Sequence, residues 1–92
     1  MTGEALLGDW LQSLGDERRL SPHTLRAYSA SVGRFLAHAG QAHGRPADLS
    51  LLERLDAADI RGFLAARRRD GLGNASAARE LSAVRGFVGW LR

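Results

Sequence analysis

Residues 21–40 read SPHTLRAYSASVGRFLAHAG and carry the complete pattern of one amphipathic helix. Ser21 is a good N-cap, Pro22 suits the first helical turn, and Gly40 fits just past a helix end. Between them an apolar stripe recurs at intervals of three and four residues: Leu25, Tyr28, Val32, Leu36 and Ala39, with Phe35 widening it. This pattern predicts a helix with one face in a core.

Segments before and after residues 21–40 also carry the apolar spacing of amphipathic helices. The segment 4–18 places Leu7, Trp10, Leu11 and Leu14 at helical spacing. A third helix is expected to start with Asp56 as its N-cap and Asp59 in its first turn, and to stop at Gly71, with Ile60, Phe63 and Leu64 facing inward. A fourth helix is expected to begin near Asn74 or Ser76 and to run to the last residue. Its buried face is predicted to consist of Ala78, Leu81, Val84, Val88 and Leu91, with Phe87 beside them.

Residues 40–54 are expected to form a surface connection in which Leu49, Leu51 and Leu52 make one short turn under the core. No segment has the alternating pattern of a strand. The sequence therefore predicts an all-α fold, a compact four-helix bundle with crossed axes, as a single domain over residues 1–92.

Composition excludes several classes of protein and site. The chain has 92 residues, of which 45% are hydrophobic, so it supports one modest core. The absence of cysteine excludes disulfide scaffolds and Cys-based zinc sites. Its three histidines lack metal-ligand spacing, so we expect no metal and no cofactor. No long apolar run or signal peptide is visible, which predicts an intracellular protein without a membrane partner.

Charge is distributed unevenly along the chain. Residues 1–60 hold six Arg against eight acids, a net charge of −2, whereas residues 61–92 hold seven Arg against two acids, a net charge of +5. This asymmetry indicates a polyanionic partner for the C-terminal third. The run Arg67-Arg68-Arg69 has a second interpretation, as a solvated helix end whose cations complement the helix dipole.

Catalytic residues are hard to find in this sequence. His23 and Arg26 have a His-x-x-Arg spacing beside the single tyrosine, but Tyr28 falls on the apolar stripe and is interpreted as a core residue with its hydroxyl at the edge. Asp56 and Asp59 are interpreted as helix-start residues and not as an acid–base pair. We therefore expect no catalytic residue in this chain.

Three segments together resemble the N-terminal region of tyrosine recombinases, the phage-integrase family. Residues 17–28 (ERRLSPHTLRAY) are similar to the entry of its second helix, residues 55–67 (LDAADIRGFLAAR) to its third, and residues 76–87 (SAARELSAVRGF) to the start of its fourth. The likeness covers about residues 5–92 and is closest to the bacterial Xer recombinases of the XerC type. One departure is that Gly86 and Gly89 stand where the family usually has bulkier or basic residues.

The resemblance implies a fold and a function. In that family this region is the core-binding domain, a SAM-like four-helix bundle that binds one face of DNA, while a separate C-terminal domain cleaves the DNA. The chain is then expected to be part of a longer recombinase that acts in chromosome-dimer resolution or a related integration reaction, and to bind the recombination half-site without cutting it. The alternative is a helical protein–protein interaction module that binds no DNA.

The resemblance also implies which residues meet DNA, because the family's second and fourth helices enter the major groove. Carried over by position, these are Thr24 and Arg26, expected on the exposed side of their helix opposite Leu25 and Tyr28, together with Ser76, Arg79, Arg85 and His23. Arginine forks suit guanine or phosphate and hydroxyls suit phosphate oxygens. The implied partners are double-stranded DNA and further recombinase protomers, four on two DNA sites, with no small-molecule ligand, in the bacterial cytoplasm.

Overall fold

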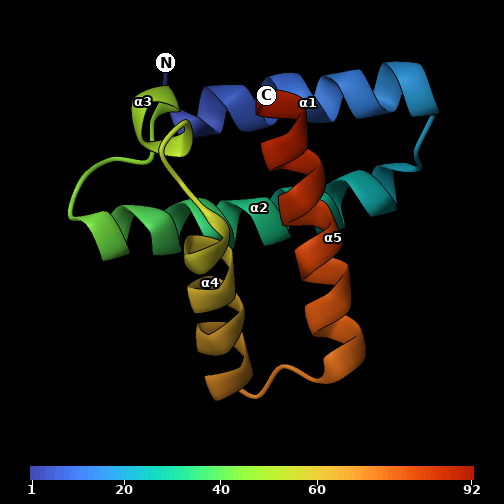
Figure 1. Cartoon of the computed structure of the whole chain (residues 1–92). Coiled ribbons are helices and arrows are strands. Elements are labelled where there is room, and N and C mark those ends of the chain that lie inside the picture. Colours follow the sequence, from blue (N-terminus) through green and yellow to red (C-terminus); the bar gives the residue numbers. More distant parts are fainter.

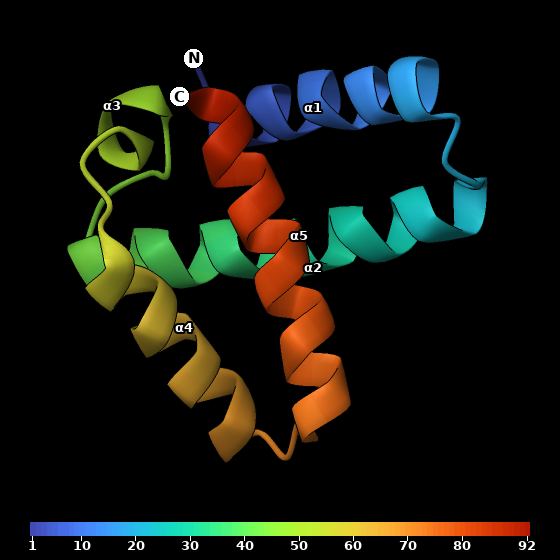
Figure 2. The same cartoon turned by 45° about the vertical axis from the view of Figure 1, so that its right-hand side comes forward.

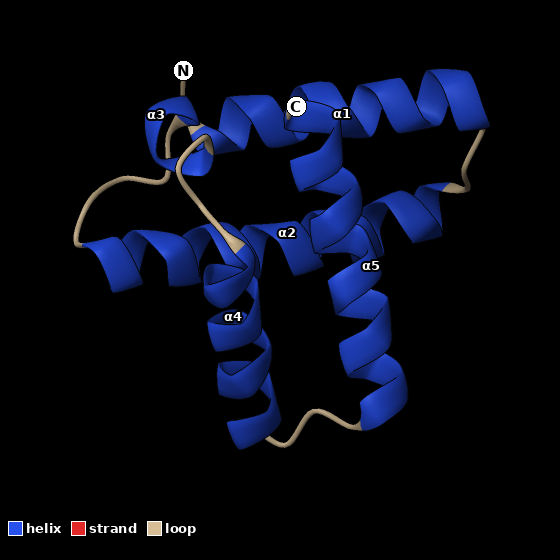
Figure 3. Ribbon diagram, viewed as in Figure 1, coloured by secondary structure: helices blue, strands red, loops and turns tan.

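Five helices make up the fold, and the computed structural model describes all residues from 1 to 92. They are α1 (Gly3–Arg18), α2 (Pro22–His43), α3 (Leu49–Leu52), α4 (Ala57–Arg69) and α5 (Asn74–Leu91). Loops alone join them, and no strand is present (Figure 3). The prediction of an all-α fold with four long helices is therefore confirmed, and α3 is the short turn expected around residues 49–52.

The helices lie in two pairs that cross each other. α1 and α2 run antiparallel, joined by a short turn, and α4 and α5 form a second hairpin on the other side of α2 (Figure 1). α5 crosses α2 and continues to α1, so that the C-terminus lies close to the N-terminal end of the chain (Figure 2). α2 is the central element, since it contacts α1, α4 and α5. None of the helices is both long and apolar enough to span a membrane.

Side-chain caps start four of the helices. Ser21 Oγ accepts a hydrogen bond of 3.2 Å from the Thr24 amide, and Asp56 accepts from Ala58 and Asp59 in a complete capping box. Both residues are therefore the N-caps that the sequence predicts. Thr2 and Asp48 cap α1 and α3 in the same way. α5 begins at Asn74, and its N-cap residue, Gly73, provides no side-chain hydrogen bond.

The predicted end of α2 is wrong by one turn. The helix continues through Gly40 to His43, and Gly44 ends it in the left-handed conformation with a φ of 64°. Gly40 has a different role, because the following loop folds back over it. The Arg45 amide donates to the Gly40 carbonyl, and a Cβ on Gly40 would lie 3.1 Å from the Arg45 carbonyl oxygen.

The core lies where α1, α2 and α5 meet. Sixteen residues form it: Leu6, Leu7, Trp10, Leu14, Val32, Phe35, Leu36, Ala39, Leu51, Leu52, Leu55, Phe63, Ala83, Val84, Phe87 and Val88. The Trp10 ring stacks on Tyr28 with centroids 5.8 Å apart and meets Phe87 edge-on at 5.5 Å. The interpretation of Tyr28 as a packing residue is confirmed, because its half-buried ring lies against this core.

The buried face of α5 differs from the predicted one. Ala78 is exposed, whereas Ala77, Glu80 and Ala83 are buried together with Val84 and Phe87. Val84, Phe87 and Val88 are buried as predicted, and Leu91 packs partly buried against the core. The difference is confined to the first half of the helix, where Ala77 and Glu80 are buried in place of Ala78 and Leu81. Glu80 conceals the true stripe in the sequence, because a carboxylate does not count as a core position. Of the two atypical glycines, Gly86 lies against the Trp10 ring and Gly89 faces open space.

The two glycines within α2 allow a matched test of packing. Nothing lies within 4 Å of a Cβ built on Gly33, so Gly33→Ala is expected to raise the free energy of unfolding by about 0.5–1 kcal/mol. Gly40→Ala is expected to give no such gain, because its Cβ would press on the Arg45 backbone. Urea denaturation followed by circular dichroism measures both, and equal stabilisation by the two variants would contradict this packing.

Candidate functional site

A cleft lies between the first halves of α2 and α5 and has a volume of about 760 Å³. Its lining contains four of the six residues that the sequence analysis singled out: His23, Thr24, Ser76 and Arg79. Arg34 of α2 and Arg67 of α4 also line it. Two helix starts that lie about fifty residues apart in the sequence thus form opposite walls of one cleft.

The rim residues are held by short-range hydrogen bonds. Arg79 Nη2 donates to Ser76 Oγ over 3.0 Å, one turn earlier on α5. Thr24 Oγ1 and Ser21 Oγ share a hydrogen bond of 3.0 Å at the start of α2. His23 and Arg79 are exposed. Hydroxyl groups and a guanidinium are therefore presented together to solvent.

One sequence-based placement needs correction, that of Thr24, whereas Arg26 is exposed as predicted. Thr24 does not lie opposite Tyr28: it is half-buried and lines the same cleft, because residues four apart share a helix face. Arg26 and Arg85 are exposed, but neither lines the cleft. The structure therefore groups His23, Thr24, Ser76 and Arg79 and leaves these two arginines outside the group.

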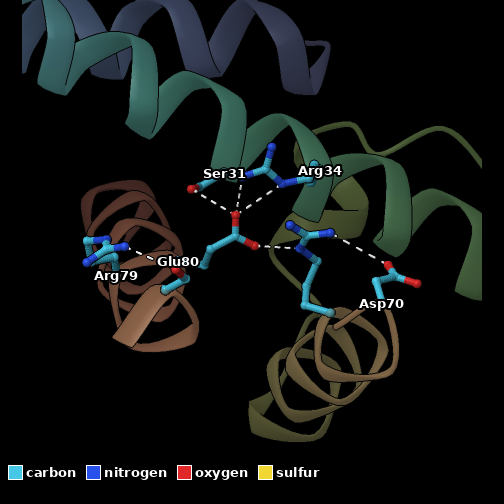
Figure 4. A network of polar contacts seen from close by, with 7 residues as sticks. Ser31, Arg34, Asp70, Arg79 and Glu80 are labelled. Atoms are coloured by element: carbon cyan, nitrogen blue, oxygen red, sulfur yellow. Dashed lines mark hydrogen bonds and ion pairs between the residues drawn. The ribbon is translucent and has the colours of Figure 1, made fainter. Parts of the chain in front are cut away.

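A buried carboxylate lies at the floor of the cleft. Glu80 of α5 is only 4% exposed and points toward α2 (Figure 4). Its Oε2 accepts hydrogen bonds from Ser31 Oγ (3.1 Å) and Arg34 Nε (3.0 Å), and the Arg34 Nη2 also binds it. Its Oε1 accepts from Arg67 Nε at 2.8 Å. Glu80 thereby joins three helices, α2, α4 and α5.

Sequence reasoning missed Glu80, although one signal could have found it. The residue occupies the stripe formed by Ala77, Val84 and Phe87, at intervals of three and four. A charged residue at such a position has to find partners on neighbouring helices. Counting Glu80 as a member of the buried stripe would have predicted both the correct face of α5 and a buried ion pair.

The arginines of the C-terminal third divide into paired and unpaired groups. That third contains only two acids, Asp70 and Glu80, and both bind Arg67, at 3.6 Å and 2.8 Å. Arg68, Arg79 and Arg85 form no ion pair. The excess positive charge noted in the sequence is therefore carried by exposed arginines with no acidic partner.

No group of three or more His, Asp or Glu side chains is placed to hold a metal ion. The polar side chains of the site are hydroxyl groups, a histidine, arginines and one buried acid. Of these, hydroxyl groups and unpaired arginines are groups that bind phosphate oxygens in proteins.

Comparison with known proteins identifies the family. Residues 7–92 match the family model described as "Phage integrase, N-terminal SAM-like domain". The chain belongs to this family. The resemblance noted in the sequence is thus confirmed, and so is the SAM-like fold.

Relatives of this phage integrase N-terminal domain are proteins named "Tyrosine recombinase XerC". That of Rhodospirillum centenum is 45% identical over 83 residues, which cover 90% of this chain and 24% of the relative. That of Methylobacterium sp. strain 4-46 is 42% identical over 82 residues, or 89% of this chain and 25% of the relative. That of Salmonella typhi is 43% identical over 82 residues, which cover 89% of this chain and 26% of the relative.

The chain therefore spans about a quarter of the length of the curated relatives it matches. No solved structure matches it.

Three carboxyl groups of this phage integrase domain have a lowered pKa. Burial raises the pKa of Glu80, but the hydrogen bonds from Arg34 and Arg67, the charge of Arg34 and the Ser31 hydroxyl together outweigh it. The pKa of Asp59 is lowered mainly by the Asp56 amide and further by His43, whose Nε2 lies 2.7 Å away. The pKa of Asp48 is lowered mainly by the Leu51 amide, with help from Arg45.

These pKa values predict how stability depends on pH. A carboxyl group with a lowered folded-state pKa stabilises the fold fully above its unfolded pKa, about 4, and loses this contribution as the pH falls through the folded value. We expect the stabilising contribution of these three carboxyl groups to the free energy of unfolding to be complete near neutrality and to decrease below about pH 4. Glu80→Gln should make the acid-side decrease shallower. Denaturant titrations between neutral and acidic pH, followed by tryptophan fluorescence, measure this; an identical acid dependence in both proteins would refute the role of Glu80.

Proposed function

We propose that this chain is the DNA-binding core-binding domain of a XerC-like site-specific tyrosine recombinase. It binds one recombination half-site in double-stranded DNA and does not itself cleave. The longer protein acts in chromosome-dimer resolution or in a related integration reaction in the bacterial cytoplasm. Family membership and the XerC names of the relatives support this assignment.

The observation that carries the proposal is the cleft between α2 and α5. His23, Thr24, Ser76 and Arg79 were selected from the sequence by family resemblance, and all four line one surface. Its chemistry suits a nucleic acid: Arg79 offers a planar fork for guanine or phosphate, and Thr24 and Ser76 offer hydroxyls. Arg26 and Arg85, exposed on the same two helices, extend the contact to flanking phosphates.

Charge supports the same partner. Residues 61–92 carry a net charge of +5, and their two acids, Asp70 and Glu80, both form ion pairs with Arg67. An excess of exposed, unpaired arginines attracts a polyanion and makes its binding dependent on salt.

Cleavage is assigned to another part of the longer protein. The chain covers about a quarter of its relatives, and we propose that residues 1–92 form one non-catalytic domain of such an enzyme. Tyr28 is the only tyrosine, and its half-buried ring is stacked on Trp10. We propose that its role is packing.

A surface for a second partner lies at the end of α5. Trp90 is 41% exposed, and its ring stacks on Phe87 with centroids 6.5 Å apart. An exposed tryptophan is typical of protein interfaces. We propose that this end contributes to contacts between recombinase protomers. It is also the feature that favours the alternative function, an interaction module that binds no DNA.

The first test is the salt dependence of DNA binding. If about three to five phosphates are neutralised, the slope of log affinity against log salt should be roughly −3 to −4.5. Arg79→Ala is expected to cost about 1–3 kcal/mol and to weaken the preference for the half-site, if its fork meets a guanine. Fluorescence anisotropy with a labelled XerC half-site and a shuffled duplex measures both quantities.

Arg68→Ala is the matched control, because it removes an exposed arginine from the end of α4, outside the cleft. It should have little effect on affinity or preference. Equal losses of DNA affinity in Arg79→Ala and Arg68→Ala would show that the DNA is attracted to any basic residue. The proposal that Arg79 contacts bases of the half-site would then be rejected. No binding by the wild-type chain at low salt would favour the interaction module.

The second test concerns cleavage. We expect no covalent protein–DNA adduct from this chain on a nicked recombination site, and the same result for Tyr28→Phe. Denaturing gel electrophoresis with end-labelled DNA detects such adducts. An adduct formed by the wild type and lost in Tyr28→Phe would make Tyr28 a nucleophile and would overturn the assignment.

A further inference from the structure

We propose that Glu80 selects which arginines of the cleft can bind DNA: it holds Arg34 and Arg67 against the protein and leaves Arg79 as the cation that meets the nucleic acid. This inference rests on the proposed DNA-binding function and goes beyond it. In this proposal the buried Glu80 limits the non-specific attraction between the cleft and DNA phosphates.

The contacts of Arg34 show how strongly it is held. Its Nε and Nη2 both bind Glu80 Oε2, and it makes no ion pair with any other acid. Its side chain is nevertheless 43% exposed, so it lies at the opening of the cleft and not in the core. Without Glu80 this guanidinium would be free to turn toward an anion in the cleft.

Arg67 is held more firmly. It binds Glu80 Oε1 and also Asp70, and its side chain is 21% exposed. The four residues Arg34, Arg67, Asp70 and Glu80 together carry no net charge. Although three arginines line the cleft, the balance of this cluster removes two of them from the attraction of phosphate.

Arg79 differs from both. Its only hydrogen bond is to the Ser76 hydroxyl, a neutral partner, and it makes no ion pair. Figure 4 shows it apart from the Glu80 carboxylate. It therefore keeps its full charge and most of its N–H groups for a ligand. A single placed guanidinium favours one register on DNA, whereas three mobile ones would bind any phosphate.

The decisive variant is Glu80→Gln, which keeps the shape of the side chain and removes its charge. Arg34 is expected to be released, adding about one phosphate contact. Each such contact makes affinity fall roughly threefold further between ~50 and ~200 mM salt. We expect this steeper dependence, tighter binding at low salt to a duplex of arbitrary sequence, and a smaller preference for the XerC half-site. A purely structural role would weaken binding to both duplexes.

Asp70→Asn is the charge-matched control. It also raises the net charge by one, within the same network, but leaves Arg34 bound to Glu80. It should leave the salt dependence close to that of the wild type. The double variant Glu80→Gln with Arg34→Gln should return to the wild-type slope.

A further variant keeps the proposal testable if Glu80→Gln does not fold, which circular dichroism would reveal. Arg34→Gln alone should leave the salt slope unchanged, whereas Arg79→Gln should reduce it by about 0.9. The inference is overturned if Glu80→Gln has the wild-type slope, if Asp70→Asn behaves like Glu80→Gln, or if Arg34→Gln reduces the slope as Arg79→Gln does. Absence of any wild-type binding would overturn the proposed function as well, so the two failures are distinguishable.

Discussion

One buried carboxylate connects the helices that the rest of the structure depends on. Glu80 reaches from α5 to Ser31 and Arg34 on α2 and to Arg67 on α4, at the crossing of three helices. Around it the contact is apolar: Val32, Phe35, Val84 and Phe87 are completely buried. The apolar residues supply most of the free energy of packing. Glu80 adds direction, because hydrogen bonds to a carboxylate require a particular rotation of each helix.

This arrangement has a consequence for the surface. Glu80 lines the cleft between α2 and α5, where its ion pairs with Arg34 and Arg67 neutralise part of the positive charge of the lining. The arginines of the cleft are therefore divided by their partners into ion-paired and unpaired residues. Arg67 bridges two acids, whereas Arg79, twelve residues later, contacts only a hydroxyl.

Family membership and this geometry support each other. The match to the phage integrase N-terminal domain covers residues 7–92, and four of the six residues that the resemblance selects on α2 and α5 line one cleft. The relatives are about four times longer than the chain.

The sequence by itself determined the features that depend on neighbours along the chain. Ser21 and Asp56 were identifiable as caps because each bonds to an amide within three residues. The stripe of α2 was visible because helical periodicity needs no information from elsewhere. Family resemblance located Ser76 and Arg79, which share one turn of α5.

Only the tertiary structure decided the rest, because those features depend on distant segments. The sequence predicts that α2 ends at Gly40, but the helix continues to His43 and Gly44 ends it. The glycine at position 40 instead leaves room for the Arg45 backbone, which folds back against it. The buried face of α5 includes Glu80 and excludes Ala78 because Arg34, 46 residues away, neutralises the carboxylate and Ser31, 49 residues away, donates a hydrogen bond to it. Which arginines stay free is likewise a matter of long-range pairing. Local periodicity cannot reveal it, because a charge is tolerated in a core only when the fold brings its partners to it.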